Sequence, residues 1–381
     1  MFAGLAKLFR EWKGLKAFKR VPREDRRLVF YSEGAGYWSY FEPVFKALQS
    51  IHGAPILYVT SAENDPLLVN TPSGMRSFYI GDGSFRTLFF ATLDVDVLLM
   101  TMPDLQSFHI KRSPFSVHYA YLHHSIVSSH MIYRPAAFDH FDSILCVGPH
   151  HVEETKAREQ ALNLPAKILV EHGYGRLDTI AQNARTSPSL SQGSIIQVLV
   201  APTWGENGLI ERHGVEVINP LIEAGLQVVL RPHPRTRLLS PAALNTLVDF
   251  YKDESLFRLD EDANGSTSLL NSAIMVSDWS GAALEFAFGL ERPVIFVDVP
   301  RKILNPDYAT LGLEPIEVQA REQLGVVLPT ARLGELGTVA QEMVADSEKW
   351  QATICKARQR WIFHAGKSGD AAAAYLMSLV D

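Results

Sequence analysis

Short apolar segments alternate with helical patterns along most of the chain, and this order restricts the possible folds more than any other feature. The segments begin at residues 27, 54, 77, 95, 117 and 143, and again at 195, 226, 272 and 292. Buried strands of parallel sheets have this near-continuous apolar character, and the helices between them form the crossovers. The polar stretch 181–194 separates the two series and is typical of a linker. The pattern therefore predicts an α/β protein with two doubly wound, Rossmann-like domains facing a central cleft.

The length of 381 residues fits two domains that each bury a core of their own. We predict a separate segment over 1–27, an N-terminal domain over 28–180 and a C-terminal domain over 195–381. The last part of the chain, 350–380, has the pattern of two helices with a break near residue 366, and whether the final helix crosses back to the first domain stays open. Two cysteines, without metal-ligand spacing, indicate a reducing compartment and no disulfide.

Residues 1–27 carry nine lysines and arginines against three acids, a local charge of +6 in a chain of net charge −6. Apolar side chains recur there every three or four residues, which places them on one helical face with lysines around the other; they are Phe2, Leu5, Phe9, Trp12, Leu15 and Phe18. Two interpretations stay open. The helix either lies on an anionic membrane surface, or docks on its own domain with a solvated basic face.

Charge and hydropathy also argue against several classes of protein. The chain beyond residue 27 has a net charge of −12, which disfavours a nucleic-acid partner. The most apolar stretch, 87–102, is interrupted by Asp94 and Asp96 and does not read as a membrane span. Lysines interleave the N-terminal apolar residues, so no cleavable signal is expected. We expect a cytoplasmic protein that is peripheral on the inner face of the cell membrane.

The turn 277–281 follows a predicted strand and begins a predicted helix. Free N–H groups and the helix dipole favour a phosphate at such a place, where Ser277 and Ser280 add hydroxyl groups and Gly281 permits close approach. Asp278 belongs to the same turn, and either it or Ser280 could simply cap the helix. Glu285, between one and two turns further on, either accepts hydrogen bonds from a ribose or lies at the solvent edge.

A second group of polar residues ends the predicted strand 226–230. Arg231 and Arg235 flank His233, and the prolines on both sides of the histidine fix the backbone. Guanidinium groups bind phosphate oxygens through paired hydrogen bonds, and a histidine that titrates near neutrality can give or take a proton. We therefore predict an anion-binding role for this segment, with a structural loop histidine as the alternative.

Eight of the 13 histidines fall between residues 118 and 172, but their spacing fits no metal-binding helix motif. We predict no metal and no cofactor. His123 or His124, at the end of a predicted strand, could face the cleft as a general base. The turn around Gly34 and the small-residue loop around Thr203 are further cleft candidates. Since the turn at 33–38 is not a GxGxxG motif, a nicotinamide cofactor is not supported.

Six short motifs occur in one order: "HHSI" from residue 123, "GYGRLD" from 173, "APTWGEN" from 201, "RPHPR" from 231, "SDWSG" from 277 and "HAGKSGD" from 364. This order resembles the CDP-glycerol glycerophosphotransferase family, the teichoic acid primases and polymerases of bacterial cell envelopes. The resemblance runs from about residue 116 to the C-terminus. It implies a GT-B fold and transfer of a polyol phosphate from a CDP-linked donor.

The resemblance also suggests roles for individual residues. It places the family's catalytic histidine on His124, with His123 in the place of a tryptophan, although the adjacent register stays open. The histidine of the R-x-H-P motif falls on His233. The remaining correspondences are phosphate-contacting serines at Ser277 and Ser280, the acidic helix residue at Glu285, and a late motif that includes Lys367 and Ser368. Gly281 replaces a serine of the family pattern, and Glu285 replaces an aspartate, which puts the identity of the polyol in question.

The function expected from these motifs is transfer of a polyol phosphate, first of all glycerol phosphate, from CDP-glycerol or a similar CDP-polyol. The acceptor would be a hydroxyl group of a lipid-linked or polymeric glycan of the cell envelope or capsule, and CMP would be released. Arg231, His233, Arg235 and the turn 277–281 would hold the phosphates, while His124 would act as base. Three alternatives stay open: a nucleotide-sugar glycosyltransferase, a sugar-nucleotide 2-epimerase, and a non-catalytic nucleotide-binding protein at the membrane.

Overall fold

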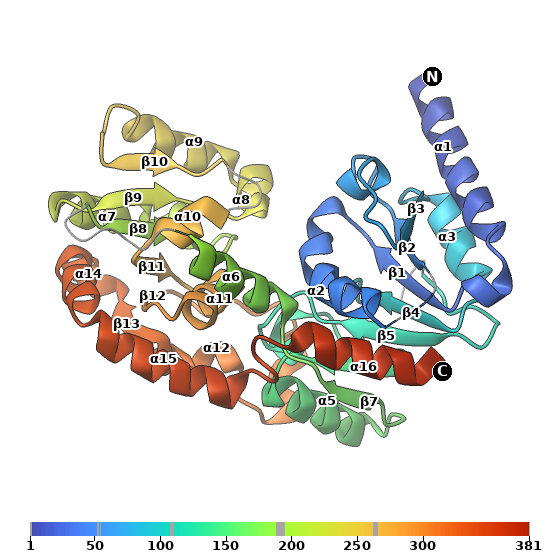
Figure 1. The fold of residues 1–381 in the computed structure, drawn as a ribbon. Coiled ribbons are helices and arrows are strands. Elements are labelled where there is room, and N and C mark those ends of the chain that lie inside the picture. Colours follow the sequence, from blue (N-terminus) through green and yellow to red (C-terminus); the bar gives the residue numbers. More distant parts are fainter. Residues whose placement is uncertain are drawn as a thin grey trace.

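Two parallel sheets, one in each half of the chain, form the framework (Figure 1). The computed structural model describes residues 2–51, 53, 55–106, 110–187, 195–261 and 266–380. The two sheets lie on either side of the predicted division near residue 180. Residues 181–186 of the predicted linker are helical instead, and residues 188–194 lie outside the described part. The exact domain limits stay a prediction.

The first sheet has seven strands in the order β3-β2-β1-β4-β5-β6-β7. The reversal of order between β1 and β4 creates a topological switch point, where open α/β sheets bind ligands beyond the carboxyl ends of their strands. The strands are β1 (Leu28–Ser32), β2 (Ile56–Thr60), β3 (Met75–Tyr79), β4 (Val97–Met100), β5 (His118–Leu122), β6 (Ser143–Cys146) and β7 (Ile168–Glu171).

The second sheet has six strands in the order β10-β9-β8-β11-β12-β13, so β8 and β11 flank its switch point. Every strand pairing among the described residues is parallel, as the continuous apolar segments predicted. The strands are β8 (Gln197–Val200), β9 (Gln227–Leu230), β10 (Phe257–Leu259), β11 (Ile274–Ser277), β12 (Val294–Asp298) and β13 (Gly325–Pro329).

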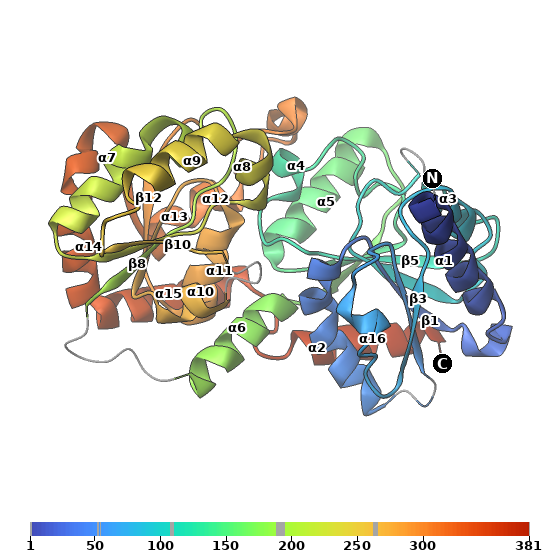
Figure 2. The same cartoon turned by 90° about the horizontal axis from the view of Figure 1, so that it is seen from above.

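Helices cover both faces of each sheet (Figures 1 and 2). Those before the linker are α1 (Phe2–Lys19), α2 (Trp38–Gln49), α3 (Ser84–Ala91), α4 (Ser129–Ile132), α5 (Pro149–Leu162) and α6 (Gly175–Thr186). Those after it are α7 (Leu209–Glu223), α8 (Pro234–Leu239), α9 (Pro241–Phe250), α10 (Ser266–Asn271), α11 (Gly281–Leu290), α12 (Ile316–Gln319), α13 (Arg321–Leu324), α14 (Leu336–Ala345), α15 (Ser347–Trp361) and α16 (Ser368–Val380). No helix among the described residues is long and apolar enough to cross a bilayer.

Helix α1 divides its apolar residues between two environments. Leu15 and Phe18, in its second half, are buried in the first domain, where Phe18 packs edge-on against Phe78 and Phe89. Leu5, Leu8, Phe9 and Trp12, which we call the α1 outer face, are exposed to solvent. The helix projects from the body at its N-terminal end (Figure 1). Docking on its own domain is therefore confirmed for the second half only, while the side chain of Phe2 lies outside the described part.

The C-terminal helix α16 crosses back and packs against α2 of the first domain (Figure 1). The packing is close, because a Cβ atom on Gly369 would lie 2.4 Å from the carbonyl oxygen of Pro43. Asp178 holds the segment that precedes α16: its carboxylate accepts from the N–H groups of Gly366, at 2.6 Å, and Ser368, at 2.9 Å. The chain thus passes between the two domains twice: once before the first strand of the second sheet, and once after the last.

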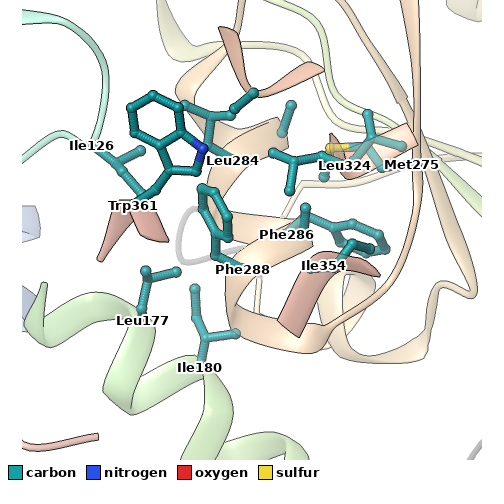
Figure 3. Close-up of a cluster of buried hydrophobic side chains, with 14 of the residues drawn as sticks. Ile126, Leu177, Ile180, Met275, Leu284, Phe286, Phe288, Leu324, Ile354 and Trp361 are labelled. Atoms are coloured by element: carbon teal, nitrogen blue, oxygen red, sulfur yellow. The ribbon is translucent and has the colours of Figure 1, made fainter. Parts of the chain in front are cut away.

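The junction between the domains has an apolar core of its own. Ile126 from the first domain, Leu177 and Ile180 from α6, and Phe288 from α11 belong to one buried cluster (Figure 3). A Cβ atom on Gly289 would lie only 2.7 Å from Cγ2 of Ile180, so α6 and α11 are in close contact. This core fixes how the carboxyl edges of the two sheets face each other.

Candidate functional site

His124 follows β5 at the carboxyl edge of the first sheet. Its Nδ1 atom lies 2.9 Å from the carbonyl oxygen of Thr101, which follows β4, and 3.0 Å from Oη of Tyr121. A carbonyl oxygen only accepts hydrogen bonds, so Nδ1 carries the ring proton and Nε2 keeps its lone pair. Burial lowers the pKa of His124 to about 4, against the opposite effect of the Thr101 hydrogen bond. The imidazole is therefore neutral at physiological pH and able to accept a proton at Nε2.

His123 does not share this position, and its burial favours His124 as the histidine that can face a ligand. Its ring is 2% exposed and stacks on His151, with ring centroids 3.7 Å apart. His151 and His150 in turn hold the chain after His124, since their Nε2 atoms lie 2.9 and 3.0 Å from the carbonyl oxygens of Val127 and Ile126. Burial lowers the pKa of all three of these histidines. They form part of the interior that supports the His124 loop.

Aromatic rings from α2 and its approach surround His124. The rings of Tyr37 and Tyr40 contact the imidazole with centroids 5.3 and 6.2 Å away, and Oη of Tyr133 lies 3.4 Å from Nε2. Glu33, directly after β1, is also part of this wall, and burial raises its pKa to about 7. Gly34, a candidate in the sequence analysis, is half-buried here, and its carbonyl oxygen accepts a hydrogen bond from the hydroxyl of Ser32. Glu33 belongs to the turn that was a cleft candidate, whereas the three tyrosines were not predicted, because isolated tyrosines carry no motif.

His233 lies at the carboxyl end of β9 on the second sheet and begins α8. Its Nδ1 accepts a hydrogen bond from the N–H of Arg235 at 3.1 Å, which leaves the ring proton on Nε2. Burial, followed by the charges of Lys302 and Arg235, lowers the pKa of His233 to about 4. The prediction that this histidine titrates near neutrality is wrong for this arrangement. His233 can serve as a neutral N–H donor, with the nearby positive charge coming from other residues.

The two arginines of the same motif face the first domain. Arg231 lowers the pKa of Tyr40, and Arg235 lowers that of Tyr37, although burial raises both tyrosine pKa values overall. These two tyrosines are the ones whose rings contact the imidazole of His124. The guanidinium of Arg235 also lies 4.5 Å from the ring centroid of Trp204. The structure therefore brings the two predicted groups to opposite walls of one site.

Two members of the turn 277–281 are sealed in the interior, contrary to the prediction. The hydroxyl of Ser277 donates to the carbonyl oxygen of Ala201 at 2.7 Å, and Oδ1 of Asp278 accepts from the N–H of Thr203 at 2.7 Å. Ser277 is fully buried, and Asp278 is 1% exposed. These side chains join β11 to the loop after β8, so the predicted contact of either with a donor phosphate is wrong for this arrangement.

The rest of the turn stays accessible. Ser280 caps α11, with its Oγ accepting from the N–H of Ala282 at 3.3 Å, as the capping alternative predicted. Both Ser280 and Gly281 are half-buried. A Cβ atom on Gly281 would lie 3.1 Å from Cγ1 of Val127, so the start of α11 meets the loop that follows His124. Phosphate binding by Ser280 and Gly281 stays a prediction.

Glu285 is engaged with the first part of the chain. Its Oε2 accepts from Nε of Arg176 at 2.7 Å, and its Oε1 accepts from the hydroxyl of Tyr174 at 2.9 Å. The hydroxyl of Tyr174 also lies 3.1 Å from the carbonyl oxygen of His124. Because both carboxylate oxygens are occupied, the structure does not support the prediction that Glu285 accepts hydrogen bonds from a ribose. It links α11 to the backbone of the His124 loop.

Of the remaining predicted residues, Thr203 lies in the site, and Lys367 and Ser368 lie outside it. Thr203 belongs to the site: its hydroxyl accepts from Nζ of Lys302 at 2.7 Å, and Lys302 was not predicted from the sequence. Ser368 is fully buried and hydrogen-bonds to Asp178, so it fixes the crossing of the chain, while the side chain of Lys367 is exposed. Within the residues that the structure describes, no group of three or more histidine, cysteine or acidic side chains could hold a metal ion.

A cavity of about 410 Å³ lies beside this site, between the two domains. Gly36, Trp38 and Ser39 from the first domain line it together with Arg176 on α6 and Leu269 on α10. It does not include His124 or His233, so its size alone does not identify where chemistry occurs. The carboxyl edges of the strands, where the histidines and arginines meet, carry the stronger functional indication.

A family model described as CDP-glycerol:poly(glycerophosphate) glycerophosphotransferase matches residues 137–301 of the chain. The resemblance to this family is confirmed. Over this part the chain is similar to CDP-glycerol glycerophosphotransferases, and its two α/β domains have a GT-B fold. The match covers the motifs at Thr203, His233 and Ser280, whereas His124 lies before it. No curated protein sequence matches the chain significantly.

Solved structures share this fold at low sequence identity. The wall teichoic acid polymerase TagF aligns with a TM-score of 0.61 and 14% identity, covering 98% of this chain and 94% of TagF. MnaA from S. aureus, solved with UDP, aligns with a TM-score of 0.60 and 14% identity over 93% of this chain and 97% of its own. UDP-GlcNAc 2-epimerase from Neisseria meningitidis aligns with a TM-score of 0.59 and 13% identity, covering 92% of this chain and 99% of its own. These similar scores establish the fold and do not separate a transferase from an epimerase.

Proposed function

We propose that the protein transfers glycerol phosphate, or a similar polyol phosphate, from a CDP-linked donor to a hydroxyl group of a cell-envelope or capsular glycan and releases CMP. The family match favours this reaction over sugar transfer and over epimerisation. The observation that carries it is that His124, a neutral, half-buried imidazole, contacts the rings of Tyr37 and Tyr40. Arg235 and Arg231 of the second domain act electrostatically on these same two tyrosines. Phosphoryl transfer needs a base on one side and positive charge on the other.

The reaction step assigns one atom to each role. The acceptor hydroxyl oxygen attacks the phosphorus that bears the polyol, and its proton passes to Nε2 of His124. As the new oxygen–phosphorus bond forms, the bond from that phosphorus to the bridging oxygen breaks, and the electron pair leaves with CMP. The neutral His124 ring is suited to this step because its Nδ1–H is already held by the Thr101 carbonyl, which orients Nε2.

The donor side needs charge neutralisation rather than an acid. A phosphate leaving group is weakly basic and does not require protonation. Nε2–H of His233 supplies a hydrogen bond to a phosphate oxygen, while Arg231 and Arg235 supply positive charge. Ser280 and the N–H groups at the start of α11 add donors where the helix dipole favours an anion.

A substrate panel tests the reaction. The purified protein would be incubated with CDP-glycerol, CDP-ribitol, UDP-N-acetylglucosamine and other nucleotide sugars, with a lipid-linked disaccharide or a glycan polymer as acceptor. We expect acceptor-dependent release of CMP from a CDP-polyol. Acceptor-dependent release of UDP would replace the proposal with sugar transfer, and a new sugar nucleotide without acceptor would indicate an epimerase. Nucleotide binding without any turnover would indicate a non-catalytic protein.

The α1 outer face supports a location at the cytoplasmic face of the cell membrane. Leu5 and Phe9 are 60% and 61% exposed, and Trp12 lies beside them with Lys16 4.6 Å from its ring centroid. Lys13, Lys16 and Lys19 are exposed along the same helix, and Arg20, which follows it, is exposed as well. An apolar face bordered by cations fits an anionic lipid surface.

A further inference from the structure

Lys302 lies in the loop after β12, at the same carboxyl edge that carries His233 and Ser280. Its Nζ donates to Oγ1 of Thr203 at 2.7 Å and to the carbonyl oxygen of Trp204 at 3.1 Å. The ammonium also lies 3.7 Å from the ring centroid of Trp204. These contacts hold a flexible side chain in one place, between the loops that follow β8 and β12.

Two hydrogen bonds leave one of the three ammonium N–H groups for another acceptor. Three charged side chains from different elements act on the ammonium group of Lys302. Arg235 repels its positive charge, and Asp278 and Glu211 attract it. Asp278 is fixed in the interior, where its Oδ1 accepts a hydrogen bond from the N–H of Thr203. The positive charges of Lys302 and Arg235 therefore gather beside His233 at this edge of the sheet.

A purely structural role is the alternative for Lys302, because its hydrogen bonds also join two loops. Joining loops does not require a second cation beside Arg235, since a neutral donor would make the same two hydrogen bonds without repulsion. Charges of one sign collected at a ligand edge are, in contrast, what an anionic ligand needs. The guanidinium of Arg235 and the ammonium of Lys302 both lie over Trp204, so they share one location.

We propose that Lys302 is a further donor-binding residue, which contacts the phosphate that leaves on the nucleotide. This inference rests on the proposed function for the choice of nucleotide, but the contact itself requires only a nucleoside phosphate. The residue lies just beyond the part of the chain that matches the family model, residues 137–301. In the reaction, Lys302 neutralises the negative charge that develops on the leaving phosphate, next to the hydrogen bond from His233.

The Lys302 loop also reaches the first domain. The N–H groups of Leu304 and Asn305 donate to the carbonyl oxygen of Met131, at 3.1 and 3.0 Å, and the amide of Asn305 donates to the carbonyl oxygen of His130 at 2.8 Å. Met131 and His130 lie on α4, which follows the His124 loop. The cation for the leaving phosphate and the base for the acceptor are thus attached to the same junction.

Nucleotide binding by the full chain tests the inference. Dissociation constants for CMP and cytidine, and for UDP and uridine, would be measured calorimetrically for the wild type, Lys302→Met, Lys302→Arg and the exposed-lysine control Lys356→Met. We expect Lys302→Met to weaken binding of the phosphorylated nucleotide at least tenfold and that of the nucleoside less than threefold. Lys302→Arg should restore most of the loss, and Lys356→Met should resemble the wild type.

The two proposals fail in different ways. If Lys302→Met weakens nucleotide and nucleoside equally, or neither, the phosphate contact is wrong even when CDP-glycerol is the substrate. If the wild type binds UDP and not CMP, the proposed donor is wrong, and the UDP-to-uridine comparison still decides the role of Lys302. Thermal unfolding of each variant identifies a general loss of structure. If Lys302→Met has lost structure, it is compared with Lys302→Arg, because arginine keeps the positive charge. A difference in affinity between the two variants that is larger for the nucleotide than for the nucleoside supports the contact. An equal difference for both ligands contradicts it.

Discussion

Hydrogen bonds to the backbone set the protonation of both site histidines. Thr101 accepts from Nδ1 of His124, so Nε2 is the basic nitrogen, whereas the N–H of Arg235 donates to Nδ1 of His233, so Nε2 is the donor. Both pKa values are lowered to about 4, chiefly by burial. Each ring is therefore neutral above pH 5, with opposite roles at the same nitrogen.

Replacing His233 with alanine should lower kcat by about two to three orders of magnitude, because one hydrogen-bond donor to the developing charge is lost. The fold should persist, since the histidine is only half-buried. Initial rates with CDP-glycerol would be compared with those of the wild type and of His140→Ala, which removes an exposed histidine. Near-normal turnover by a folded His233→Ala protein would contradict the role of His233.

The pH dependence of kcat/KM should show a basic limb near pH 8. Burial lowers the pKa of Lys302 to about 8, and Arg235 acts in the same direction. The ammonium is charged below this value, so the stabilisation of the leaving phosphate is present at lower pH and is lost as the pH rises through 8. In Lys302→Arg the limb should move to higher pH, because guanidinium stays charged. Rates from pH 6 to 10 would measure this; an unmoved limb in the arginine variant would assign it to another group.

At the scale of elements, the apolar residues of α1 have two roles. Those of its second half pack on the first domain, and those of its first half form the α1 outer face. Gly14 lets the helix lie against β3, because a Cβ atom there would be 1.9 Å from the carbonyl oxygen of Tyr79. Glu11 is buried beside it, with its carboxylate near the hydroxyl of Tyr79. The helix is thus anchored by its second half, and this anchoring holds the α1 outer face away from the core.

Replacing both Phe9 and Trp12 with serine should reduce binding to anionic vesicles at least tenfold, because two aromatic side chains no longer enter the lipid. Sedimentation with vesicles of anionic and of neutral lipid would measure the change, and added salt should weaken the wild-type interaction. Phe250→Ser, on α9 of the other domain, is the control, since Phe250 is equally exposed. Equal sedimentation of all variants would remove the membrane proposal. Point changes are preferable to deleting residues 1–27, which would also remove Leu15 and Phe18 from the core.

Edge position explains which strands the sequence pattern missed. Ten strands were predicted, and all ten are present. The three others, β7, β10 and β13, each end a sheet. An edge strand is covered less completely, so it needs fewer apolar residues: Ile168 in β7 is 50% exposed, and no residue of β10 is fully buried. The remaining edge strand, β3, has apolar residues that the pattern detected, because α1 packs against it through Phe18.

At the scale of the whole molecule, the two crossings of the chain join the domains. The crossing before α16 depends on Asp178, which lies on α6 and binds the backbone of Gly366 and Ser368. Glu285 makes a second link, because it pairs with Arg176 on the same helix. Helix α6 therefore contacts both domains and the C-terminal segment.

Asp178→Ala should reduce the free energy of unfolding by about 2–4 kcal/mol, since two N–H groups and the buried hydroxyl of Ser368 lose their charged acceptor. Denaturant unfolding would measure the loss, with Asp253→Ala as a matched control at an exposed acid. If stability is unchanged, the crossing is held by the packing of α16 on α2 alone. The change should also loosen the domain junction, so that proteolysis of the segment around Gly366 becomes faster than in the wild type.

The sequence by itself determined the two parallel sheets, the order of the motifs and the placing of His124, His233 and the turn 277–281 at strand ends, because these depend on local periodicity and on residues close together in the chain. Only the tertiary structure decided which of those side chains can reach a ligand. The hydroxyl of Ser277 donates to the carbonyl oxygen of Ala201, and the carboxylate of Glu285 accepts from Tyr174 and Arg176. Lys302, in contrast, is hydrogen-bonded to Thr203 at the site. Each of these contacts joins residues 76 to 111 positions apart, and hydrogen-bond partners at such separations are fixed by packing, which leaves no local pattern in the sequence.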